Sequence, residues 1–273
     1  MDSNGRFHSQ RIGFERPKLS LVDLNDVFKV ILDKLEKEKH FTIFYGEDIG
    51  FQGWTPGIVG NNFEAYCLSE IGRRIKSPFH QEKLKYKEVD LFDLIELLYS
   101  NIQLESRSAL MEHTILNSTE AKEYSKSIFR TQINNQLSRY DLGWELTHEG
   151  YIRELVTAEF RDLVDNPIQS GHEERVDSFI RRGIKNFLEY GATQEDKKSA
   201  LVEIGNGLEF IRKELEKQMP AAEDDIFHLL NKFYLRHNNK NQNVDYDTEI
   251  YYPWMFYTYI STFDAYVKLI QRQ

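Results

Sequence analysis

The stretch YYPWMFYTYISTFDAYVKLI, residues 251–270, decides the fold that this chain is expected to adopt. Its apolar side chains recur at helical spacing and nearly surround the segment: Trp254, Phe256, Tyr257, Ile260, Phe263, Tyr266, Val267 and Ile270. A helix that is apolar on almost every side lies at the centre of its bundle or at an interface. Pro253 suits a first helical turn, where its missing amide proton costs nothing. The sequence therefore predicts a helical bundle in which the last helix begins at Pro253.

A polar segment, FYLRHNNKNQNVDYDTE at 233–249, separates this helix from the apolar stretch DDIFHLLNKFYL at 224–235. Arg236 carries a permanent charge on a planar fork that matches phosphate, and His237 titrates near neutrality and can move a proton. These are the two groups that metal-free RNA cleavage needs. Asn238, Asn239 and Gln242 suit the binding of a ribose or phosphate, and equally suit helix capping and bonds within a loop. Composition alone favours the structural loop.

The overall composition and charge limit the classes of function that this chain can have. The 273 residues carry a formal net charge of −9, which argues against a nonspecific nucleic-acid binder but not against a nuclease with a small basic pocket. Cys67 is the only cysteine, so an intrachain disulfide and a cysteine-based zinc site are excluded. The acidic pairs lack further ligands at compatible spacing, so neither a metal nor a cofactor is expected. No apolar run reaches the length of a membrane span, and a cytoplasmic protein is expected.

The remaining pattern predicts a mainly α fold with one small β-hairpin. Residues 1–19 read as a flexible arm, 20–125 as an N-terminal helical module with a Gly-rich loop, and 126–273 as a C-terminal helical domain. Two β-friendly runs around Glu149-Gly150 predict the hairpin near 143–154. Helices are expected near 22–39, 61–76, 88–101 and 118–140, and in the three segments between the hairpin and Pro220.

Two further features leave alternatives open. Thr193 and Asp196 predict a capping box ahead of an apolar seam formed by Leu201, Ile204, Leu208, Ile211 and Leu215. That seam packs inside its own bundle or forms half of a homodimer contact. The Gly-rich loop contains Trp54 and lacks the Gly-Lys-Ser/Thr of a phosphate-binding loop. It is either an aromatic-pinned surface loop or a surface that recognises a partner.

Three stretches carry a resemblance to a known family. They are INNQLSRYDLGWELTHEGYIREL at 133–155, RRGIKNFLEYGATQEDKKSALVEIGNGLEFIRKELEK at 181–217, and LLNKFYLRHNNKNQNVDYDTEIYYPWMFYTYISTFDAYVKLI at 229–270. Together they resemble the C-terminal part of bacterial abortive-infection proteins of the AbiJ type. Those proteins are similar to the HEPN superfamily of helical bundles, many of which are RNases of phage-defence and toxin systems.

The resemblance implies an anti-phage factor that cleaves RNA without metal, with Arg236 and His237 as catalytic residues. Asn238, Asn239, Gln242 and Tyr246 would then bind the substrate. It also implies a homodimer, because HEPN relatives commonly pair two such turns, and a partner defence protein. The HEPN pattern has a second histidine after four to six residues, and Gln242 stands in that place. Glutamine cannot exchange a proton near neutral pH.

That departure keeps two other functions open. One is a noncatalytic interaction or sensor protein of a defence system, in which the polar turn is structural. The other is a nucleotide-sensing pocket at the same turn, with Tyr246 or Tyr251 as the stacking aromatic.

Overall fold

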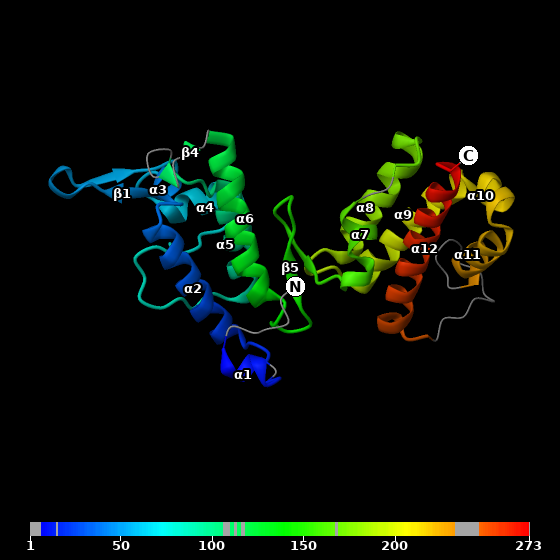
Figure 1. Cartoon of the computed structure of the whole chain (residues 1–273), viewed down its shortest axis with the longest axis horizontal. Coiled ribbons are helices and arrows are strands. Elements are labelled where there is room, and N and C mark those ends of the chain that lie inside the picture. Colours follow the sequence, from blue (N-terminus) through cyan, green and yellow to red (C-terminus); the bar gives the residue numbers. More distant parts are fainter. Residues whose placement is uncertain are drawn as a thin grey trace. The chain divides into compact units, whose positions relative to one another are not determined.

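The computed structural model describes residues 7–14, 16–105, 110–111, 114–115, 118–166, 169–232 and 246–272. The chain divides into two compact units, Met1–Leu155 and Val156–Gln273. Helices dominate both units (Figure 1), which confirms the mainly α fold. We expected the boundary between the two parts at residue 125, whereas the two units meet at residue 155. Residue 125 lies inside the long helix α6 (Ser118–Leu137), and the hairpin that follows this helix belongs to the first unit.

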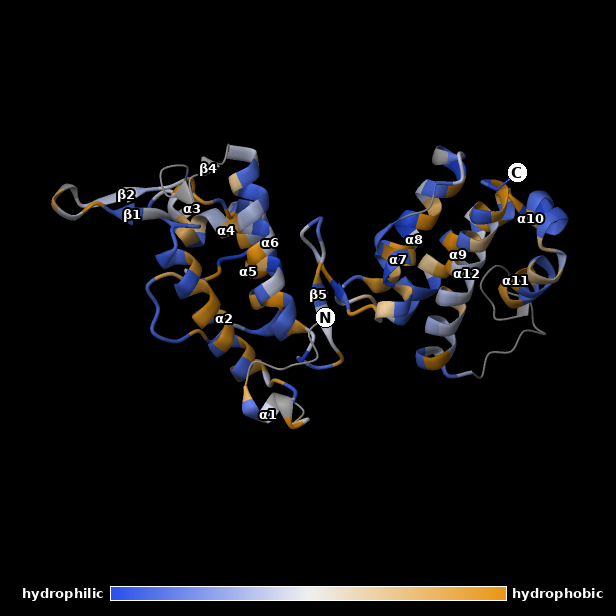
Figure 2. Cartoon of the chain, in the orientation of Figure 1, coloured by the Kyte–Doolittle hydropathy of each residue, from blue (hydrophilic) through white to orange (hydrophobic). Residues whose placement is uncertain are grey.

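The helices of the first unit pack around a core of leucine and phenylalanine side chains. α2 (Leu21–Lys37) begins at a capping box, in which Ser20 and Asp23 bond each other's backbone amides. Its buried apolar residues recur at helical spacing, and hydrophilic residues lie between them along the helix (Figure 2), as in an amphipathic helix. α2 packs against α6, and α6 also contacts α5. The other helices are α1 (His8–Arg11), α3 (Thr42–Tyr45), α4 (Phe63–Ile71) and α5 (Glu88–Asn101).

The end of the expected N-terminal arm is held by hydrogen bonds. Arg139 donates to the carbonyl of Pro17 at 3.0 Å, and Lys18 donates to the carbonyl of Asp141 at 2.7 Å. The amide of Leu19 donates to the carbonyl of Arg139 at 2.8 Å. Residues 17–19 are therefore part of the folded unit, whereas residues 1–6 and 15 lie outside the described residues.

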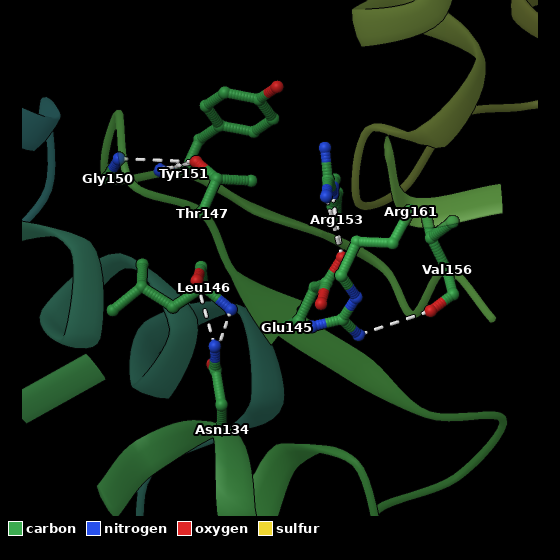
Figure 3. Close-up of polar contacts among 9 residues, drawn as sticks. All are labelled: Asn134, Glu145, Leu146, Thr147, Gly150, Tyr151, Arg153, Val156 and Arg161. Carbon is green, nitrogen blue, oxygen red and sulfur yellow. Dashed lines mark hydrogen bonds and ion pairs between the residues drawn. The ribbon is translucent and has the colours of Figure 1, made fainter. Parts of the chain in front are cut away.

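The predicted hairpin is present as β5 (Trp144–Leu146) and β6 (Ile152–Glu154), paired antiparallel. Figure 3 shows the amide of Asn134, on α6, facing Leu146: it donates to the Leu146 carbonyl at 3.0 Å and accepts from the Leu146 amide at 2.7 Å. Asn134 thus occupies the place of a third strand. Across the strands, Arg153 donates twice to one oxygen of Glu145, and both side chains are buried.

We expected one β-hairpin, but the described residues contain three two-stranded antiparallel sheets. β1 (Gly46–Asp48) pairs with β2 (Trp54–Pro56) inside the Gly-rich loop. β3 (Leu110–Met111) pairs with β4 (Thr114–Ile115). Strands of two or three residues are too short to show the alternation that identifies a strand in sequence.

The second unit is a bundle whose elements share one apolar core. They are α7 (Ala158–Asp165), a π-helical turn (Glu173–Asp177), α8 (Ser178–Leu188), α9 (Gln194–Phe210), α10 (Arg212–Gln218), α11 (Pro220–Lys232) and α12 (Thr248–Ile270). α8 and α9 approach closely at Gly183, where a Cβ atom would overlap Ile204 and lie 3.0 Å from the carbonyl oxygen of Ala200. The absence of a side chain at Gly183 thus sets the spacing of the two helices.

The apolar seam expected at 193–218 packs inside this bundle. All five of its members are buried within the chain, which decides between the two alternatives in favour of the intrachain one. The predicted capping box at Thr193 and Asp196 is also confirmed. The single helix expected here is divided at Ile211 into α9 and α10. None of the helices that the structure describes is both long and apolar enough to cross a bilayer.

A buried histidine links three parts of the first unit. His40 lies after α2, and its Nδ1 is 2.8 Å from the hydroxyl oxygen of Ser125 on α6. That hydroxyl donates to the carbonyl of Ala121 and accepts from the amide of Leu104, so His40 must supply the proton of the shared bond. Burial lowers the pKa of His40 from its ordinary value near 6.5, Lys34 lowers it further, and Glu38 opposes both effects.

The lowered pKa of His40 predicts a loss of stability in acid. Neutral His40 contributes its full stabilisation above pH 6.5, and this contribution falls as the pH decreases below 6.5 toward the pKa of the folded state. Thermal unfolding from pH 7.5 to 5.5 should show a steeper decline in wild type than in His40→Gln. His148→Gln is the control, since the His148 side chain is 72% exposed. An equal decline of stability with falling pH in wild type and His40→Gln would contradict the lowered pKa of His40.

Candidate functional site

The candidate site is the polar connection between α11 and α12. Five of its predicted residues, Arg236, His237, Asn238, Asn239 and Gln242, lie outside the described residues. Tyr246 is the first described residue after the connection.

Both helices that carry the connection are anchored in the core of the second unit. α11 and α12 contact each other. α11 contributes Ile226, Phe227 and Leu230 to the core, each at most 3% exposed. α12 contributes eight buried side chains: Tyr252, Met255, Phe256, Tyr259, Ile260, Phe263, Tyr266 and Val267. The residues at which the polar connection leaves α11 and enters α12 are therefore fixed by packing.

The start of α12 corrects the prediction that this helix begins at Pro253. The helix begins at Thr248, and Pro253 lies inside it. Asp247 is the N-cap, whose carboxylate accepts a hydrogen bond from the amide of Glu249 at 3.0 Å. The favourable position of Pro253 misled the prediction, because the aspartate cap six residues earlier starts the helix. The polar connection is consequently shorter than the sequence suggested.

Three aromatic residues form a row at this end of α12. The ring of Tyr246 lies edge-to-face with that of Tyr251, with centroids 5.5 Å apart, and Tyr251 lies edge-to-face with Trp254 at 6.0 Å. Tyr251 and Trp254 are exposed, whereas Tyr246 is half-buried against the core. Burial is the main cause that raises the pKa of Tyr246, and a hydrogen bond with Tyr252 adds to it. Such a row can stack on nucleobases or on another protein surface.

A groove continues from Trp254 along the outer face of α12. Its volume is about 540 Å³, and its walls include Phe160 of α7 and Met219. Phe160 stacks on Tyr257 with ring centroids 4.2 Å apart. Ser261 and Ala265 also line the groove. The sequence carried a signal for this face, because Ile250, Trp254, Ser261 and Ala265 recur at helical spacing, but it did not show that the face is open.

A second hollow, of about 420 Å³, lies beside α11. Arg212 lines it, but its guanidinium bonds Glu223 at 2.5 Å and lies 4.3 Å above the ring of Phe227. Asp224, Asp225 and His228 line the remainder. Because Arg212 is already paired and two aspartates repel phosphate, this hollow is a poor anion site.

The described residues contain no group of three or more His, Cys, Asp or Glu side chains that could hold a metal ion. No family model, curated protein or solved structure matches the chain. The resemblance to abortive-infection proteins therefore rests on the sequence stretches quoted above.

The start of α12 can be tested at its cap. Asp247→Ala should lower the free energy of unfolding by about 0.5–2 kcal/mol, the usual range for the loss of an N-cap. Chemical denaturation of the purified chain measures this change. Asp225→Ala, an exposed aspartate inside α11, is the control and should change stability far less. An unchanged unfolding midpoint for Asp247→Ala would instead support a helix that begins at Pro253.

Proposed function

We propose that this protein cleaves RNA without a metal ion, at the connection between α11 and α12, as an abortive-infection factor of the HEPN-like class. The observation that carries the proposal is the position of the Arg236-His237 pair. In the sequence, the pair lies between two helices that both pack in one core. The resemblance of the surrounding sequence and the neighbouring aromatic row support it. The proposed compartment is the cytoplasm.

The proposed reaction uses the ribose itself as the nucleophile. His237 accepts the proton of a 2′-hydroxyl, and the 2′-oxygen then attacks the adjacent phosphorus. The bond from phosphorus to the 5′-oxygen of the next nucleotide breaks, which leaves a 2′,3′-cyclic phosphate and a 5′-hydroxyl. Arg236 holds the phosphate and stabilises the negative charge that it gains. A water or the protonated His237 returns a proton to the leaving oxygen.

The remaining predicted residues would position the substrate. Asn238, Asn239 and Gln242 supply amide groups to the ribose and phosphate, and Tyr246 begins the aromatic row on which a base could stack. Gln242 cannot serve as a second acid, so the leaving oxygen takes its proton from protonated His237 or from water. A homodimer would bring a second such connection to the site.

A second candidate function is supported by the outer face of α12. Ile250 and Trp254 are 65% and 47% exposed, and the groove beyond them is mostly apolar. A face of this kind is typical of a protein contact. In this alternative the chain forms a homodimer or binds a partner defence protein, and the polar connection is structural.

An assay of purified full-length protein on single-stranded RNA in excess EDTA tests the first candidate. Arg236→Ala should lower the cleavage rate by about 100-fold, the scale for loss of one electrostatic donor. His237→Ala should lower it at least as much. Arg272→Ala and His148→Ala, both exposed and outside the site, should cut at the wild-type rate.

Wild-type rates for Arg236→Ala and His237→Ala would contradict the proposal, as would cleavage that EDTA abolishes. The second candidate predicts a different result: wild type leaves the RNA intact, and Trp254→Asp changes the mass of the complex in solution.

A further inference from the structure

The first unit contains a pocket of about 560 Å³ that lies on the Gly-rich loop. Its walls come from the end of α3, the start of β2, the start of α4, and the loop between α4 and α5. This volume falls within the range of about 300–1,000 Å³ that is common for small-molecule sites. The pocket shares no residue with the polar connection in the second unit.

Two aromatic side chains form one wall and are held rigidly. Tyr45 stacks on the buried ring of Phe79 with centroids 4.1 Å apart. Trp54 lies edge-to-face with Tyr45 at 5.1 Å, and its side chain is 40% exposed at the pocket. Because Phe79 already fixes Tyr45, a ligand that stacks here would not lose binding free energy to ordering both rings.

The glycines explain why the loop holds its shape. The amides of Gly57, Ile58 and Val59 donate to carbonyls of Tyr45, Ile43 and Phe44 at 3.0–3.1 Å. A Cβ atom on Gly57 would lie 2.5 Å from two of those carbonyl oxygens, so only glycine lets the backbone approach. The loop is therefore bonded to the end of α3 and brings Asn61 and Asn62 into the same pocket as Tyr45 and Trp54.

The opposite wall is polar and keeps hydrogen-bonding capacity. Asn62 uses its carbonyl oxygen to accept from the amide of Ala65, which leaves its NH₂ group as a donor. Within the part of the chain that the structure describes, Asn61 and Gln81 have no side-chain hydrogen bond, and Lys76 has no ion pair. The hydroxyl of Tyr86 bonds the carbonyl of Lys76 at 2.7 Å and fixes the backbone there.

These groups define a ligand class. A ligand that fits this pocket has a flat ring to stack on Trp54, hydrogen-bond donors and acceptors for the carboxamides, and an anionic group for Lys76. A nucleotide has all three. Glu64, also at the pocket, can accept from a ribose hydroxyl or a base amino group. A cationic ligand fits less well, because Lys76 would repel it and the carboxamides would lack a partner.

We propose that this pocket binds a nucleobase with an attached phosphate, stacked against Trp54 with the phosphate at Lys76. The ligand is either a free nucleoside monophosphate or one residue of an RNA strand, since both carry the same groups. The proposal adds a binding site to the chain and does not depend on RNA cleavage in the second unit.

Isothermal titration of the full-length protein tests the proposal with AMP, GMP, CMP and UMP, with the matching nucleosides, with a short oligoribonucleotide, and with inorganic phosphate. At least one monophosphate or the oligonucleotide should bind, and inorganic phosphate should not. Trp54→Leu should weaken binding by about tenfold or more, because base stacking on an aromatic ring is lost. Lys76→Gln should weaken binding of the phosphorylated ligand but not that of the nucleoside.

Matched controls separate this site from the rest of the chain. Phe210→Leu removes a similarly exposed aromatic side chain from the second unit, outside the aromatic row and the polar connection, and should leave the affinity unchanged. The mononucleotides contain no scissile bond between nucleotides, so their binding is measured without cleavage, and failure of the cleavage proposal leaves this one standing. Circular dichroism checks that each variant folds, and Gln81→Ala replaces Trp54→Leu if the latter does not.

Three outcomes would overturn the proposal. The first is the absence of binding by every nucleotide and by the oligonucleotide at millimolar concentration. The second is equal binding of inorganic phosphate, which would mean an adventitious ion only. The third is wild-type affinity in folded Trp54→Leu and Lys76→Gln.

Discussion

The burial of α12 is the constraint on which the second unit depends. Eight of its side chains are removed from solvent, and the ring of Phe256 lies parallel to that of Phe187 on α8, with centroids 4.2 Å apart. A helix buried on so much of its surface can be placed only where other helices surround it. α8, α9 and α11 supply most of the remaining core, and Gly183 lets α8 and α9 approach closely enough to close it. The ends of the polar connection are a consequence of this packing.

Sequence periodicity predicted the helices well because their apolar stripes are long. The seam from Leu201 to Leu215, the capping box at Thr193 and the hairpin around Gly150 all follow from local residue patterns. The failures have local causes too. Pro253 seemed to begin a helix that Asp247 caps, and the β1–β2 hairpin was hidden in a segment whose glycine density suggested an irregular loop.

The candidate sites could be predicted only in part. The chemistry of Arg236 and His237 can be read from residue types, and these residues stay a prediction because they lie outside the described residues. The pocket at Trp54 could not be predicted, since it needs Tyr45, Asn61 and Lys76 to meet from separate elements. The backbone bonds of residues 57–59 to α3 and the stacking of Tyr45 on Phe79 help to bring those elements together. The outer face of α12 had a visible pattern, but its exposure depends on what the other helices leave uncovered.

The two units thus contain candidate sites with different side chains. The first has a pocket that combines a fixed aromatic wall with unpaired carboxamides and Lys76, which suits recognition of a nucleotide. The second has two core-anchored helices and an aromatic row, and the segment between the helices contains the proposed catalytic pair, Arg236 and His237. With a net charge of −9, neither unit would hold RNA by a broad positive field, so binding must rely on stacking and on single cations. This dependence predicts a modest effect of salt on RNA binding.

The chemistry of the RNA ends tests the central claim most directly. Attack by the 2′-oxygen leaves a 2′,3′-cyclic phosphate and a 5′-hydroxyl, and it cannot occur where the ribose carries a 2′-O-methyl group. Mass spectrometry of products from an RNA oligonucleotide, beside its fully 2′-O-methylated form, distinguishes the mechanisms. The account predicts cyclic phosphate ends from the first and no cleavage of the second. Products with 3′-hydroxyl and 5′-phosphate ends, or cleavage of the methylated strand, would contradict it.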